Sequence, residues 1–148
     1  MANKDRSIKY FRNHFNCSQA VFTVFGTEKG LSEDQCLKAA CGFGGGMGRQ
    51  QFTCGAVTGA AMAIGLRYGK GIDDPEEKKT ETYLKVRKLF EEFQKLHGST
   101  NCRELLKGLD MNDPEDHKRI LELNLFEILC EKYVMDAVDI TEELNSQF

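Results

Sequence analysis

The chain has 148 residues, six cysteines and a formal net charge of −3 at pH 7. Its length suits one domain with its own hydrophobic core. Charges of both signs are mixed along the chain, which argues against nucleic acid or an anionic membrane surface as a partner. No stretch approaches the roughly 20 apolar residues of a membrane span and the N-terminus lacks the pattern of a signal peptide, so we expect a cytoplasmic protein with one domain over residues 1–148.

Apolar periodicity and capping residues delimit the first two predicted helices. Aromatic and aliphatic residues recur at helical spacing over residues 5–25, which predicts a single long helix. Ser32 and Gln35 have the spacing of a capping box, which predicts a second, short helix that ends at Cys41. The glycines from Gly42 onward stop that helix and form a loop.

The segment from Phe52 to Tyr68 follows this glycine-rich loop and is almost uncharged. A helix that is apolar on every side is a buried one, so we expect this segment to form the central helix of the fold. Its many alanines and glycines would let neighbouring helices approach closely. Cys54 lies near its start, directly behind the loop.

Proline and glycine delimit the rest of the chain. Asp74 and Pro75 predict the start of a long helix that Gly98 ends. A short helix is expected over residues 102–106, and a final long helix begins after Asp113 and Pro114. Because no run of alternating β-branched residues is present, we predict an all-α, compact bundle of about five or six helices, with the glycine-rich loop before the buried central helix.

The cysteines carry most of the functional information. Reduced cysteines in a cytoplasmic chain favour catalytic or metal-binding roles over a disulfide framework. Cys36 and Cys41 are interpreted as packing residues. Cys54 and Cys102 are expected at helix N-termini, where unpaired N–H groups lower the pKa of a thiol, and Arg49 would add positive charge. Cys54 is therefore the expected reactive thiolate and Cys102 the expected second catalytic thiol.

The cysteine pattern as a whole is similar to a known family. Four cysteines in this order, the second of them inside the segment Cys54–Gly59, resemble the redox-active proteins of the C-GCAxxG-C-C family over nearly the whole chain. The resemblance places the four family cysteines, here called the motif cysteines, on Cys17, Cys54, Cys102 and Cys130. It places the glycine motif on Gly55, Ala56 and Gly59. Cys36 and Cys41 lie outside the signature.

The resemblance implies an iron–sulfur cluster for electron transfer as the leading interpretation. Related domains are similar to part of the split-Soret cytochromes, which implies an iron–sulfur site, whereas the absence of C-x-x-C-H argues against covalent haem. Four thiolates would suit an iron–sulfur cluster or a zinc ion. Two thiols cycling between dithiol and disulfide, or an interaction module without redox chemistry, remain alternatives. The expected metal ligands are the motif cysteines, with Gly55, Gly59 and Arg49 around the cofactor. An electron-transfer or thiol-redox protein is the expected partner, and a homodimer stays open.

Overall fold

The computed structural model describes residues 1–146, and these contain eight α-helices, one π-helical turn and an isolated β-bridge. The all-α class is therefore confirmed, while the expected five or six helices were too few. None of the described helices combines the length and the apolar character needed to cross a membrane. The elements are α1 (Asn3–Arg12), α2 (Cys17–Glu28), α3 (Glu33–Cys41), α4 (Gly55–Tyr68), α5 (Glu77–His97), α6 (Cys102–Leu105), α7 (Pro114–Glu122), the π-helical turn η1 (Phe126–Cys130) and α8 (Glu131–Ser146).

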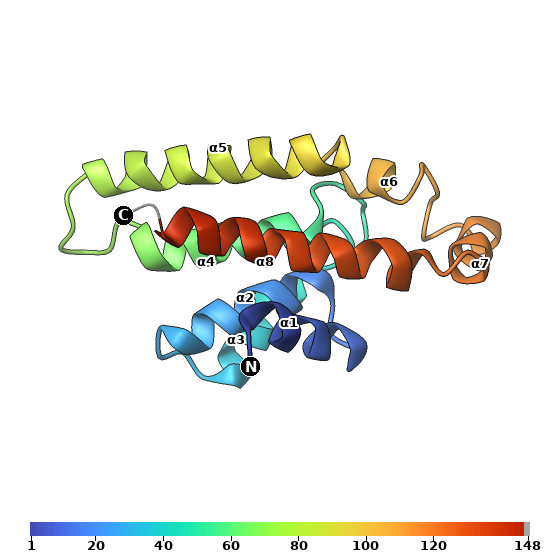
Figure 1. Cartoon of the computed structure of the whole chain (residues 1–148), viewed down its shortest axis with the longest axis horizontal. Helices are drawn as coiled ribbons and strands as arrows, with labels where there is room; N and C mark the ends of the chain where they lie inside the picture. Colours follow the sequence, from blue (N-terminus) through green and yellow to red (C-terminus); the bar gives the residue numbers. More distant parts are fainter. Residues whose placement is uncertain (147–148) are drawn as a thin grey trace.

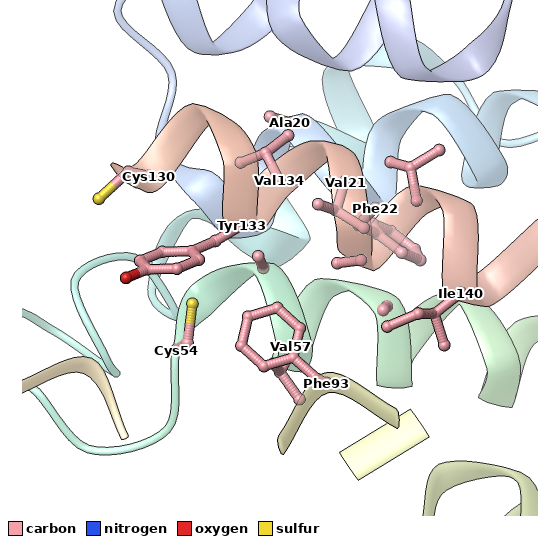
Figure 2. Packing of buried hydrophobic residues seen from close by; sticks show 14 of the residues in the cluster. Ala20, Val21, Phe22, Cys54, Val57, Phe93, Cys130, Tyr133, Val134 and Ile140 are labelled. Carbon is pink, nitrogen blue, oxygen red and sulfur yellow. The ribbon is translucent and has the colours of Figure 1, made fainter. Parts of the chain in front are cut away.

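The helices form three layers, with α4 and α8 between α5 on one side and α1 to α3 on the other (Figure 1). Both α4 and α2 are buried along most of their length, and α2 packs against α1, α3, α4 and α8. Each large aliphatic or aromatic side chain that the core removes from water stabilises the fold by about 1.5–3 kcal/mol. Core residues seen in Figure 2 include Val21, Val57, Phe93, Val134 and Ile140.

The first predicted helix is wrong, because two helices occupy its place. The chain breaks after α1 at His14, whose φ of 69° lies in the left-handed region, and α2 begins behind Asn16. The side chain of Asn16 accepts a hydrogen bond from the Gln19 N–H at 3.0 Å, and the Gln19 side chain accepts one from the Asn16 N–H at 2.9 Å. This capping box places Cys17 in the first turn of a helix instead of in the middle of one.

The last predicted helix is also divided. Its start is confirmed, since Asp113 caps α7 by accepting a hydrogen bond from the Asp116 N–H at 3.0 Å and Pro114 is the first helical residue. However, α7 ends at Glu122, and Asn124 adopts a φ of 57°. The chain then resumes as the π-helical turn η1, which runs directly into α8. Turns of this kind are rare and are frequently found at functional sites.

Other predicted helix ends agree with the structure more closely. Ser32 forms the expected capping box at the start of α3, and Gly98 ends α5 in the left-handed conformation with a φ of 81°. The start of α5 is displaced to Glu77, because the Asp74 carboxylate accepts a hydrogen bond from the Gly71 N–H at 2.8 Å and closes a turn instead of capping a helix. The central helix α4 begins at Gly55, with Cys54 in the capping position.

Candidate functional site

All four motif cysteines line one cavity of about 1050 Å³. They reach it from four separate segments: the first turn of α2, the residue before α4, the start of α6 and the end of η1. Cys41 also lies at this wall, but it is exposed, so its interpretation as a packing residue was wrong. Cys36 does not line the cavity; it is fully buried, and its Sγ lies where a side chain on Gly26 would otherwise be.

A short backbone pairing places Cys54 and Cys102 diagonally across one β-bridge. The Cys54 N–H donates to the Thr100 carbonyl at 2.8 Å, and the Cys102 N–H donates to the Phe52 carbonyl at 2.6 Å. Thr53 and Asn101 form the isolated β-bridge between these two bonds. Because both cysteines lie next to the bridged residues, the pairing brings together two thiols that are 48 positions apart in the sequence.

Close packing of α2 on α4 brings Cys17 to the same place. A Cβ on Gly59 would lie 2.7 Å from the Ser18 carbonyl oxygen, and a Cβ on Gly55 would lie 3.3 Å from the Cys17 Cβ. Only hydrogen fits at the first of these positions, so the glycines of the motif let the two helix N-termini meet. Gly55 lines the cavity, whereas Gly59 acts in helix packing, one turn away from it.

The π-helical turn and the first turn of α8 supply the opposite wall. Cys130 ends η1 and lies close enough to Cys17 to raise the pKa of that thiol. Tyr133, one turn later, donates from its hydroxyl to the Leu105 carbonyl at 2.8 Å, which ties α8 to α6. Figure 2 shows the Tyr133 ring between the sulfur atoms of Cys54 and Cys130, with all three groups at the same end of the core.

The glycine-rich loop forms a further wall in an unusual conformation. Five consecutive residues, 45–49, have φ values between 61° and 73°, and Gln51 follows with 60°. Holding a residue other than glycine there costs on the order of 1–3 kcal/mol. The buried Gln51 side chain offsets this cost by donating to the Leu109 carbonyl at 2.9 Å and accepting from the Met111 N–H at 2.8 Å. Asn112 donates to the Arg49 carbonyl at 2.7 Å, so the loop is fixed at both points.

Burial sets the ionisation of these thiols. It raises the pKa of Cys54, and the nearby Cys17 and Cys102 raise it further, so that the lowering by the N–H groups of Ala56 and Val57 is outweighed. The neighbouring Cys130 thiol and burial raise the pKa of Cys17. Burial raises the pKa of Cys102 to about 12. The expected thiolate character of Cys54 is thus opposed by its surroundings, and these thiols are neutral at pH 7 without a bound cation.

This ionisation predicts the order in which the thiols react. In reduced, metal-free protein at pH 8, we expect iodoacetamide to label the exposed Cys41 first, and to label Cys54 and Cys102 far more slowly, because the thiolate is the reacting form and both are buried. Peptide mass spectrometry over a time course measures the order, with urea-unfolded protein as the control in which the differences should vanish. Labelling of Cys54 as fast as that of Cys41 would contradict the assignment.

The sequence analysis did not identify Gln51 or Tyr133 as site residues. A glutamine inside a glycine-rich loop gives no signal of a left-handed conformation or of two buried hydrogen bonds. The position of Tyr133, three residues after a motif cysteine, was a signal, because residues at this spacing share a helix face. Arg49 lies at the mouth of the cavity, as an exposed residue of the loop.

The thiols surround a space instead of meeting at a point. Among residues 1–146, no three cysteine, histidine or carboxylate side chains are arranged to hold a metal ion together. A single zinc ion needs every sulfur ligand at about 2.3 Å, whereas an iron–sulfur cluster spreads its cysteine ligands over several iron atoms. The donor set is four thiols that line one cavity, and thiolates are ligands of both zinc and iron–sulfur clusters.

Comparisons with known proteins identify the same cysteine signature. The model of a family described as "Putative redox-active protein (C_GCAxxG_C_C)" matches residues 15–144, which include the four motif cysteines. A protein of Archaeoglobus fulgidus, described as "Uncharacterized protein", is 29% identical over 127 residues, covering 81% of this chain and 84% of its own length. No solved structure shows a significant match.

Proposed function

The chain belongs to the C_GCAxxG_C_C family of redox-active proteins, and we propose that its four motif cysteines hold an iron–sulfur cluster that exchanges electrons with a partner protein. The observation that carries the proposal is the shared cavity: thiols from four distant segments line one space of about 1050 Å³. Cysteines that only filled the core would have no reason to face the same opening. Cys36 shows that second behaviour in the same chain.

Helix ends support an anionic group in this cavity. Cys17 is the first residue of α2, and Cys54 is the capping residue of α4. The unpaired N–H groups of the first helical turn carry partial positive charge and stabilise an anion placed before them. Because both helices begin at the cavity, their N-termini would stabilise the negative charge that four thiolates bring to a cluster.

The residues of the chain have separate tasks in this proposal. Ligation requires the motif thiols to lose their protons, so cluster binding should release protons and weaken at low pH. When bound, the cluster supplies one-electron transfer. Tyr133, Leu105 and Leu106 exclude water from the inner wall, and the hydrogen bonds of Gln51 and Asn112 hold the loop in place.

Metal and sulfide analysis tests the proposal directly. Protein purified without oxygen or chelator should contain iron and acid-labile sulfide in comparable amounts, and should absorb visible light that dithionite bleaches. Colourless protein that also fails to acquire iron on anaerobic reconstitution with ferrous iron and sulfide would overturn the cluster assignment. Zinc bound at one ion per chain would favour the structural alternative.

One observation favours a second candidate, a thiol–disulfide protein. Cys130 is the largest influence on the pKa of Cys17, which supports Cys17 and Cys130 as the redox pair in place of the expected Cys54 and Cys102. In this reaction a sulfur–sulfur bond forms between them as they give two electrons and two protons to a disulfide of the partner, which becomes two thiols. Loss of two free thiols on mild oxidation, mapped to this pair, would distinguish it from cluster chemistry.

A further inference from the structure

Aromatic and charged side chains line this cavity beside the thiols, and the part that they line is here called its outer part. Its volume of about 1050 Å³ lies just above the roughly 300–1,000 Å³ typical of sites for small organic molecules. Three phenylalanines that are only partly buried contribute apolar wall area to the same cavity. They are Phe11, Phe15 and Phe126.

Two arginines line this cavity, and they differ in whether an acidic side chain balances their charge. Arg12 makes a two-pronged ion pair with Glu131, with N–O distances of 2.9 and 2.8 Å, and Glu127 also lies near it. Its charge is therefore balanced from within the protein. The guanidinium of Arg49 has no hydrogen bond or ion pair to any residue in 1–146. It is the arginine of the cavity wall whose charge an external anion could balance.

The loop presents Arg49 in a fixed position at an energetic cost. Its backbone is held in the left-handed region with a φ of 62°, and its carbonyl accepts the Asn112 hydrogen bond. A Cβ on Gly45 would lie 2.7 Å from the Arg49 Cγ, so glycine there is what leaves room for this side chain against the loop. Backbone strain retained around a charged side chain at a cavity is typical of a functional position.

We propose that the outer part of the cavity binds a small organic anion, with its carboxylate or similar group on Arg49 and its planar apolar body against the phenylalanines. Guanidinium groups bind carboxylates through paired, charge-assisted hydrogen bonds, and the flat rings suit a flat partner. That this anion is the redox substrate rests on the proposed function. That it binds does not, because none of the groups named here is a motif cysteine.

Calorimetric titration of the purified protein with benzoate and with the uncharged benzamide tests the proposal. Benzoate should bind with a dissociation constant in the millimolar range or below, and benzamide about tenfold more weakly, since a charged group adds strength to its hydrogen bonds. Arg49→Gln should remove the preference for benzoate, and Arg49→Lys should restore part of it. Arg87→Gln, which removes an exposed arginine of α5, is the matched control and should change nothing.

The outcomes separate this proposal from the cluster assignment. Equal binding of the two probes, no binding of benzoate, or an unchanged preference in Arg49→Gln would overturn the anion site. Benzoate binding that depends on Arg49 in protein without iron would uphold the anion site while the cluster assignment fails. Protein that contains iron and sulfide but does not bind benzoate would support the cluster assignment and overturn the anion site.

Discussion

Gly59→Ala is expected to destabilise the protein by about 3 kcal/mol, at the upper end of the usual cost of overpacking. The added Cβ would lie 2.7 Å from the Ser18 carbonyl oxygen and 3.1 Å from the Ser18 Cα. Both are backbone atoms, so no side-chain rotation can relieve the contact, and α2 and α4 must move apart. Because Cys17 precedes Ser18, the same movement should displace a motif thiol and lower iron retention.

Gly65→Ala is the matched control for this prediction. Gly65 lies in the same helix, and a Cβ there would meet no atom of another element within 4 Å. Replacing an interior helical glycine by alanine without a clash should stabilise the protein by up to about 1 kcal/mol. Urea unfolding followed by circular dichroism gives both free energies of unfolding. If both substitutions shifted the free energy of unfolding in the same direction, the close approach of α2 and α4 would not explain why residue 59 is a glycine.

The sequence made some helix ends predictable and concealed others. Helix ends that depend on local chemistry were predicted correctly, as at Ser32, Gly98 and Asp113, because a cap bonds to residues three or four positions away. The breaks at His14 and Asn124 were missed, because the apolar periodicity continues through them. The helices on either side of each break face one core, so the pattern records the core and not the break.

Convergence of the motif cysteines could not be predicted from their spacing. Cys54 and Cys102 meet through hydrogen bonds between two loops, and Cys130 reaches the site through a π-helical turn that no residue pattern predicts. The resemblance to a family named the four residues, but it gave no geometry. The expectation for the Cys54 pKa had the wrong direction for a physical reason, since the helix N-terminus acts as predicted while burial acts more strongly.

Cys54→Ala is expected to lower iron content by at least about tenfold. Loss of a group that only orients a metal ligand typically costs 10–100-fold in metal affinity, so loss of a ligand should cost no less. The visible absorption should fall in proportion, because the proposed cluster would be its source. Iron analysis after anaerobic reconstitution measures the effect with the metal supply held constant.

Two other cysteines separate the loss of a ligand from the loss of packing. Cys36→Ala also removes a buried sulfur atom. This sulfur packs on α2 and does not line the cavity. It should therefore destabilise the fold and keep its iron. Cys41→Ala changes the exposed thiol at the rim and should affect neither property much. If Cys36→Ala lost as much iron as Cys54→Ala, destabilisation of the fold would explain the loss of iron, and Cys54 would not be identified as a ligand.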